Sequence, residues 1–154
     1  MSAKIGNFVH RAYQNQKLMH AIIRVTCAII ISDEKILCAQ RGKNMAHPLL
    51  WEFPGGKVEN GESDEACINR EILEELNLQI EVKEKLGTTR HKYSETKEIE
   101  LIPFICSYIG GELKLREHQK VQWLTFCELS NLNWVAADLP IVDELVNKYC
   151  NNKS

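Results

Sequence analysis

The sequence predicts one α+β domain, and three observations lead to this class. Apolar, β-branched runs at residues 21–32 and 98–110 are typical of strands, whereas residues 62–78 and 140–150 repeat their apolar side chains at helical spacing. The chain has 154 residues, which is near the commonest domain size and is enough to bury roughly two-thirds of the unfolded surface. A second domain is therefore not needed.

The first predicted elements form a hairpin. Residues 21–32, AIIRVTCAIIIS, are one strand, a DEK turn follows, and residues 35–41, KILCAQR, are the next strand. The segment LLWEFPGG then leads to Gly55 and Gly56, which carry no side chain and so allow a ligand to approach the backbone closely. The remaining predicted elements are a helix at 62–78, strands within 79–94, at 98–110 and at 120–126, a loop at 111–119 and an amphipathic helix at 140–150.

Composition narrows the class of protein and its surroundings. Residues 1–20 are polar with isolated apolar side chains, so we expect an N-terminal extension there and the domain itself at residues 21–150. A net charge of -2 gives no sign of a nucleic-acid polymer as partner, and no segment is apolar enough to span a membrane. Six cysteines without a C-x-x-C pair, in a chain with no apolar signal segment, predict reduced thiols and a cytoplasmic protein.

Residues 62–78 contain the pattern that is richest in chemistry. No Pro or Gly interrupts them, and Ser63 is placed to cap the start of the helix. Glu71, Glu74 and Glu75 stand at i, i+3 and i+4 and so share one helix face, where their like charges repel. Taken alone, three glutamates are more often a solvated acidic face. Together with their neighbours they are better explained as ligands for a hard divalent cation, Mg²⁺ or Mn²⁺.

The stretch from Gly56 to Leu78 resembles the Nudix box, G-x5-E-x7-R-E-U-x-E-E-x-G-U, in which U is apolar. Asn77 stands where the family has Gly, and Asn is the next most tolerant residue for a left-handed helix end, so we expect the departure to be structural only. The similarity extends from Ala21 to Tyr149 and is greatest to the MutT branch with its CTP and 5-methyl-dCTP pyrophosphohydrolase relatives, through the segments ILCAQR, LLWEFPGGKVENGE and WVAADLPIV. It implies an α/β/α sandwich with a mixed sheet.

The resemblance also implies which residues hold the metal. These are the Gly55 carbonyl, Glu71, Glu74 and Glu75, with Glu117 brought in from the loop at 111–119. Glu71 or a loop carboxylate would help to activate water, and Glu117 is the loop candidate, although an exposed loop charge remains the alternative. Arg70 is expected to position the carboxylates, because its planar guanidinium can hold two oxygens at once.

Five residues are candidates for substrate contact, namely Gly55 through its backbone and four others by the same resemblance. Arg41 and Lys57 would meet phosphate oxygens, although either could be an ordinary surface cation. Phe53 would pack near the base, or lie in the core. Asp138 matches the position from which MutT-like enzymes read the base, where Asn is usual. A carboxylate can accept from the cytosine amine, but guanine and 8-oxoguanine also offer donors, so the base stays open.

The resemblance therefore implies a Mg²⁺-dependent nucleoside triphosphate pyrophosphohydrolase that releases NMP and pyrophosphate. The expected partner is a small-molecule nucleotide, either CTP or dCTP or a modified one such as 8-oxo-dGTP, and the protein is expected to be a monomer or a homodimer. The alternatives are an ADP-ribose or other nucleoside-diphosphate hydrolase and a non-catalytic nucleotide-binding module. Such silent modules typically lose the glutamates, and this chain keeps them.

Overall fold

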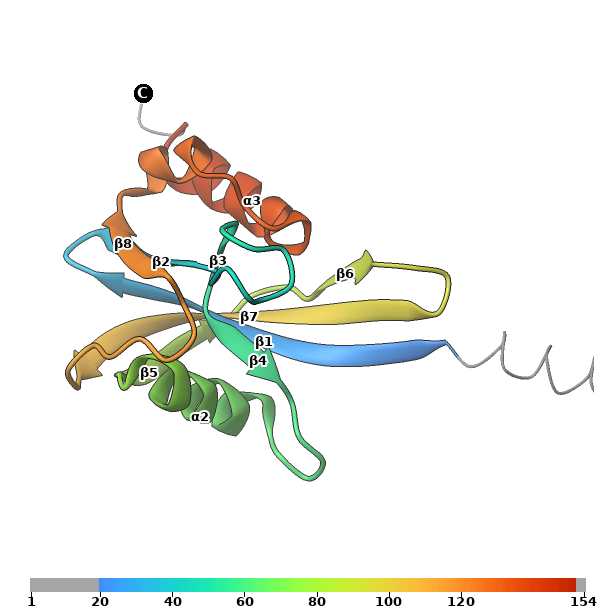
Figure 1. The fold of residues 1–154 in the computed structure, drawn as a ribbon. Helices are drawn as coiled ribbons and strands as arrows, with labels where there is room; N and C mark the ends of the chain where they lie inside the picture. Colours follow the sequence, from blue (N-terminus) through green and yellow to red (C-terminus); the bar gives the residue numbers. More distant parts are fainter. Residues whose placement is uncertain (1–19, 152–154) are drawn as a thin grey trace, which may run out of the picture.

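The fold is built around two long strands that lie side by side in a mixed sheet (Figure 1). The computed structural model describes residues 20–151, in which β1 (Ala21–Ser32) pairs in parallel with β7 (Lys97–Gly110). The sheet runs in the order β3-β2-β1-β7-β5, while β4, β6 and β8 pair with β1, β7 and β2. The other pairings are antiparallel, so the predicted mixed sheet is confirmed.

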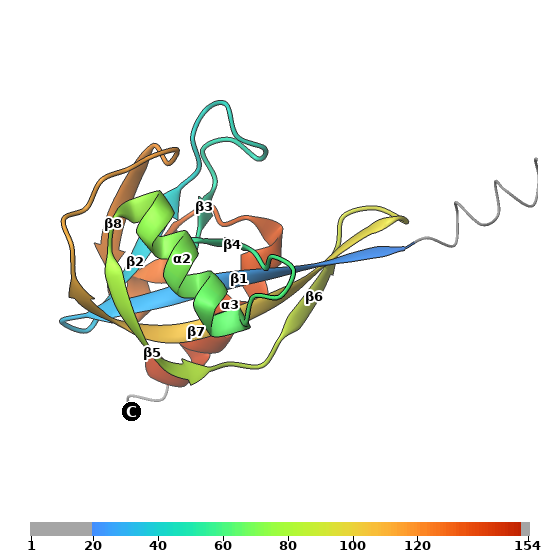
Figure 2. The ribbon, with the colours of Figure 1, turned by 90° about the horizontal axis from the view of Figure 1, so that it is seen from below.

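Within residues 20–151, two helices cover opposite faces of this sheet, which confirms the three-layer α/β/α arrangement. Figure 1 shows α3 (Leu139–Tyr149) on one side and α2 (Asp64–Leu76) on the other, and Figure 2 shows α2 lying across its face. The remaining elements are β2 (Lys35–Gln40), β3 (Trp51–Glu52), β4 (Gly55–Lys57), β5 (Gln79–Lys85), β6 (Thr89–Lys92), β8 (Lys120–Leu124) and the 3-10 turns η1 (Phe126–Asn131) and η2 (Ala136–Asp138).

The centre of β1 is apolar on both faces because both are covered. Successive side chains of a strand point to opposite faces. Cys27 and Ile29 accordingly pack in the cluster that contains α3, and Ala28 and Ile30 in the cluster that contains α2. A continuous apolar run is the pattern expected of such a strand. The two apolar clusters therefore cover both faces of the sheet, one beneath α3 and the other beneath α2.

The caps of α2 follow the sequence closely. The Ser63 side chain accepts a hydrogen bond from the Ala66 N–H at 3.1 Å, and Asn77 ends the helix in the left-handed region at φ 58°. The Asn77 side chain also donates to the Glu112 carbonyl at 2.9 Å. Asn77 therefore performs the structural task expected of the family glycine, and it ties the helix end to the loop that carries Glu117.

One strand prediction was confirmed and another needed adjustment. The hairpin of β1 and β2 is confirmed, with Asp33 and Glu34 at positive φ in its two-residue turn. The run at 79–94, however, is divided into β5 and β6, because the two parts pair with different stretches of β7. The predicted extension at residues 1–20 lies outside the described residues except for His20, so that boundary stays a prediction. No helix in the described range, 20–151, could span a membrane.

The expectation of reduced thiols is wrong at one pair of cysteines. Cys127 in η1 and Cys150 after α3 form a disulfide, with their Cα atoms 5.3 Å apart. The other four cysteines, Cys27, Cys38, Cys67 and Cys106, are free and buried. The pair is 23 residues apart in sequence, so no short spacing motif could have indicated it.

Candidate active site

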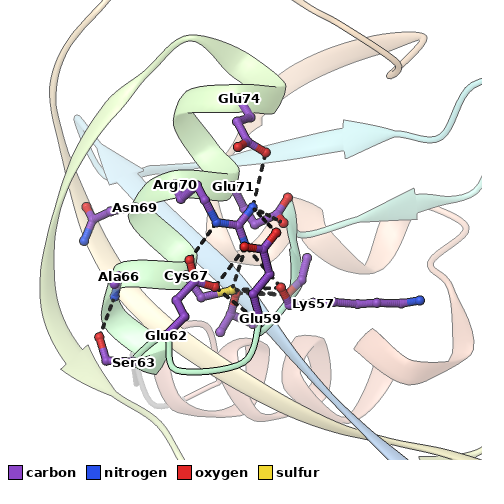
Figure 3. A network of polar contacts seen from close by, with 12 residues as sticks. Lys57, Glu59, Glu62, Ser63, Ala66, Cys67, Asn69, Arg70, Glu71 and Glu74 are labelled. Carbon is purple, nitrogen blue, oxygen red and sulfur yellow. Dashed lines mark hydrogen bonds and ion pairs between the residues drawn. The ribbon is translucent and has the colours of Figure 1, made fainter.

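Arg70 lies at the centre of the acidic cluster on α2 (Figure 3). Its Nε and Nη2 atoms donate to the two carboxylate oxygens of Glu62 at 2.7 and 2.9 Å. Hydrogen bonds from Arg70 are the main reason that the pKa of Glu62 is lowered to about 2. This forked contact is the geometry expected of a positioning arginine, and it fixes the guanidinium against the end of the β4–α2 loop.

The same guanidinium also faces two of the proposed metal ligands. Arg70 Nη1 donates to Glu71 Oε1 at 2.9 Å and to Glu74 Oε2 at 3.2 Å. Figure 3 shows these carboxylates turned toward Arg70, whereas the Lys57 side chain extends away from them. The arginine thus balances the like charges that the helix brings together.

The two glycines of β4 let the backbone approach the acidic helix. Gly55 and Gly56 pair with Cys27 and Thr26 of β1. A Cβ at Gly55 would overlap the Thr26 carbonyl, and one at Gly56 would overlap the Glu71 carboxyl group. Backbone packing therefore requires glycine at Gly55, whereas a side chain at Gly56 would displace the Glu71 carboxyl group. The Gly55–Gly56 backbone thus lies next to this glutamate.

Glu75 is the most perturbed acid of the cluster. Desolvation, followed by the charges of Glu71, Glu52 and Glu117, raises its pKa to about 8. Its Oε2 atom is buried and has no hydrogen-bond partner among residues 20–151. Carboxylates from β3, α2 and the 111–119 loop are thus near enough for their charges to act on Glu75, whose Oε2 is unpartnered in that range.

These donors fit a divalent cation. Carboxylate oxygens are the ligands that Mg²⁺ and Mn²⁺ prefer, and a cation would stabilise the ionised form of Glu75. Within the described part of the chain, no three acidic, histidine or cysteine side chains already converge on one point, because Glu71 and Glu74 face Arg70. Binding would therefore require these two side chains to turn from Arg70.

A pocket of about 360 Å³ connects this acidic end to a second, less polar end. The residues at the acidic end are Gly55, Gly56, Lys57 and Glu75, and those at the other end include Arg41, Phe53, Tyr93, Ala137 and Asp138. The structure thus brings together all five predicted substrate residues. Three of the predicted metal ligands, Glu71, Glu74 and Glu117, do not line this pocket. Glu117 is on an exposed loop, where it lines a neighbouring hollow with Lys43 and Arg116.

Asp138 and Phe53 act together at the far end of the pocket. Asp138 is 5% exposed, and its Oδ2 accepts a hydrogen bond from the Phe53 N–H at 2.8 Å. Desolvation is the main cause that raises the pKa of Asp138 to about 8, so the group can donate as well as accept near neutral pH. The Phe53 ring is buried against Trp134, with ring centroids 4.7 Å apart, and contributes mainly to the core.

Sequence reasoning missed two polar residues beside the site. Glu52 accepts from Arg41 Nη1 at 2.6 Å and contacts His118 Nε2 at 2.9 Å. Glu52 lies within LLWEFPGG, a segment that was singled out, but one acidic residue in a short strand has no periodic pattern that marks it. His118 follows Glu117 directly, and only its burial distinguishes it from its exposed neighbours.

Comparison with known proteins identifies the family to which this chain belongs. The NUDIX domain family model matches residues 22–145, most of the chain, and the chain belongs to this family. With the fold and the glutamate-lined pocket described above, it is a Nudix hydrolase. Nudix enzymes act on small-molecule nucleotide substrates and generally use divalent metals.

Three curated relatives differ in the activity that they are named for. The chain is 35% identical over 122 residues to the CTP pyrophosphohydrolase of Escherichia coli, covering 79% of this chain and 90% of that protein. It is 33% identical over 117 residues to a putative 8-oxo-dGTP diphosphatase 2 of Mycobacterium tuberculosis, covering 74% and 81%. It is 37% identical over 121 residues to an ADP-ribose pyrophosphatase of Methanocaldococcus jannaschii, covering 78% and 69%.

Solved structures agree with the fold. The Escherichia coli ORF135 protein is 31% identical, with a TM-score of 0.76, and the match covers 88% of this chain and 96% of that one. A MutT protein of methicillin-resistant Staphylococcus aureus is 42% identical, with a TM-score of 0.69, and the match covers 84% and 99%.

Proposed function

We propose that this Nudix hydrolase is a Mg²⁺-dependent nucleoside triphosphate pyrophosphohydrolase that releases NMP and pyrophosphate. The observation that carries the proposal is the single pocket of about 360 Å³ that has Glu75 and the Gly55–Gly56 backbone at one end and Asp138 at the other. Such a pocket can take polyphosphate at its acidic end through a cation and a base at its buried end. The volume lies within the range of small-molecule sites.

The residues divide the chemistry between them. The ligands would be the Gly55 carbonyl and the carboxylates of Glu71, Glu74, Glu75 and Glu117, with Mn²⁺ as an alternative ion. A bound divalent cation would neutralise the polyphosphate charge and acidify a water for in-line attack on phosphorus. Arg70 holds Glu62 and balances the acidic face. Arg41, in the wall at the other end of the pocket, would contact a phosphate oxygen where the triphosphate reaches that end.

The base end supports a nucleotide with hydrogen-bonding groups on its pairing edge. Asp138 keeps one oxygen on the Phe53 N–H, which leaves the other oxygen for the ligand. The relatives named for CTP and 8-oxo-dGTP support cytidine nucleotides and oxidised guanine nucleotides as the substrates to test first. The relative named for ADP-ribose supports testing ADP-ribose as a third kind of substrate.

A substrate panel tests the proposal. Purified protein with Mg²⁺ is incubated with CTP, dCTP, 5-methyl-dCTP, dGTP, 8-oxo-dGTP and ADP-ribose, and kcat/KM is compared with products identified by chromatography. We expect one triphosphate to be preferred and to give NMP and pyrophosphate. Preference for ADP-ribose would replace the triphosphate assignment, and no turnover on any of them would favour a nucleotide-binding module.

A further inference from the structure

His118 differs from the rest of its loop in being buried. Residues 111–117 are all exposed, whereas His118 is 7% exposed and its side chain only 2%. A polar ring that leaves water needs partners that hold it in place. His118 is therefore the residue that fixes this end of the loop in the interior, and its contacts show which groups it holds in place.

One carboxylate connects His118 to the arginine at the pocket. His118 Nε2 lies 2.9 Å from Glu52 Oε1, and the other oxygen, Glu52 Oε2, accepts from Arg41 Nη1 at 2.6 Å. Facing a carboxylate, Nε2 is the nitrogen that carries the proton. The Arg41 guanidinium also donates through Nε to the Ala46 carbonyl. Glu52 thus orients Arg41 from one side and is itself oriented by His118.

The backbone connects the same histidine to Glu117. The Gln119 N–H donates to the Gln40 carbonyl at 2.8 Å, and a Cβ at Gly42 would overlap the Glu117 carbonyl. Residues 40–42 and 117–119 are therefore packed closely together around the His118 ring. A change in the ring position would shift the adjacent Glu117, whose charge acts on Glu75.

The ring has one hydrogen bond among residues 20–151, so the Glu52 contact is decisive for its orientation. Within residues 20–151, His118 Nδ1 is buried without a hydrogen-bond partner, and the orientation of the ring depends on Nε2 and on packing. We propose that His118 is a positioning residue, which through Glu52 holds the Arg41 guanidinium at the pocket and through the backbone holds Glu117 beside the acidic helix. The kinetic consequence rests on the proposed function, whereas the structural arrangement does not.

The first test measures kinetics on whichever panel nucleotide the wild type hydrolyses. His118→Ala should lower kcat roughly tenfold to a hundredfold and raise KM several-fold, because it loosens Glu117 and Arg41 together. His118→Gln can present an amide N–H to Glu52 and should recover most of that loss. If His118→Ala lowered Tm while leaving kcat and KM unchanged, or if His118→Gln were as slow as His118→Ala, the positioning role would be disproved.

A double variant shows whether His118 acts through Glu117. His118→Ala combined with Glu117→Gln should be slower than Glu117→Gln alone by clearly less than the His118→Ala factor in kcat, since residues that act together are not additive. Fully multiplicative losses would overturn the proposal. The matched control is His20→Ala, which removes another histidine–glutamate contact, 2.6 Å from His20 Nε2 to Glu98 Oε2, at the end of β1 away from the helices (Figure 1).

Binding of Mn²⁺ alone separates this inference from the proposed function. In the protein without nucleotide, His118→Ala should weaken Mn²⁺ binding, measured by electron paramagnetic resonance, by a factor similar to that of Glu117→Gln, and His118→Gln should restore it. Equal Mn²⁺ affinity in wild type and His118→Ala would contradict the positioning of Glu117. A wild type that hydrolyses no panel nucleotide would instead refute the proposed function while leaving this readout intact.

Discussion

The two ends of the substrate pocket are assembled in different ways. At the acidic end, the residues from Gly55 to Glu75 come from one continuous stretch, β4 and α2, and helix geometry alone places the glutamates on one face. At the other end, Arg41, Phe53 and Asp138 come from three distant segments that meet only when the sheet and η2 are packed. Under the proposed function, the acidic end would carry the metal and phosphate chemistry, and the assembled end would distinguish substrates.

The largest expected effect on activity comes from substituting the glutamates of the acidic end. Glu74→Gln or Glu75→Gln should lower kcat by roughly 100- to 1000-fold, because each removes a hard oxygen ligand worth several kcal/mol of transition-state charge stabilisation. The fold should persist and Tm should change little, since the Arg70–Glu74 pair is half-exposed and contributes little, and since Glu75 is largely protonated below pH 8, where a neutral Gln resembles it. Steady-state kinetics at saturating Mg²⁺ and thermal unfolding measure the two expectations.

Glu65→Gln provides the control, because Glu65 is an exposed acid in the first turn of the same helix. It should leave kcat near the wild-type value. Near wild-type kcat in the Glu74 and Glu75 variants would show that the acidic face does not hold the metal.

The second prediction concerns the assembled end. Asp138→Ala should reduce kcat/KM for the preferred nucleotide roughly tenfold to a few hundredfold, equivalent to about 1–3 kcal/mol, and poor substrates much less. Above pH 8, where the Asp138 carboxyl is ionised and can only accept, Asp138→Asn should shift preference toward bases that offer an acceptor, such as the guanine O6; below pH 8 the carboxyl and the amide both donate and accept, and the shift should be small. Competition between nucleotide pairs measures this, with the exposed Asp143→Ala on α3 as control. The same slowing for all nucleotides in both variants would mean that Asp138 does not read the base.

The third prediction tests whether Glu117 acts together with the residues of the acidic end. Although it comes from a distant loop, its charge is felt at Glu75, so Glu117→Gln should lower kcat by roughly tenfold to a hundredfold and change KM less. Glu112→Gln, in the same exposed loop, is the matched control. Unchanged kinetics in Glu117→Gln would return this residue to the class of solvated loop charges.

The contrast also explains how much could be predicted from the sequence. The α2 helix, its Ser63 and Asn77 caps and the shared face of its glutamates follow from local spacing, and all were predicted. The hairpin and the two-sided burial of β1 follow from turn chemistry and apolar patterning. Only the resemblance to the Nudix family indicated the layer order, since periodicity alone predicts no more than α+β.

The contacts that depend on packing were beyond such reasoning. Glu52 and His118 are 66 residues apart, and neither has a pattern that reveals the other. The Cys127–Cys150 disulfide and the division between β5 and β6 likewise depend on which segments meet in the folded protein. Phe53 was weighed as either a base contact or a core residue, and only burial against Trp134 distinguishes the two.

The last expected effect is on stability rather than on activity, and concerns the buried carboxyl at the assembled end. The pKa of Asp138 is about 8 in the folded protein, against an ordinary value near 3.8. Between these values the folded state binds a proton that the unfolded state has released, so the free energy of unfolding decreases as pH rises from about 4 to about 8. The contribution is fully present below pH 4 and is lost above pH 8. Asp138→Asn cannot ionise and removes this dependence.

Urea unfolding with metal chelated, at several pH values from about 5 to 7.5, measures the difference between the two proteins. The stability of Asp138→Asn relative to wild type should rise with pH by on the order of 1 kcal/mol per pH unit, the linkage expected for one proton. Glu75 contributes a shift of the same sign to both proteins, so it cancels in this difference. Asp143→Asn, at an exposed position on α3, should give a flat difference. A flat difference for Asp138→Asn would mean that Asp138 is ionised in its pocket, and that it meets the base only as an acceptor.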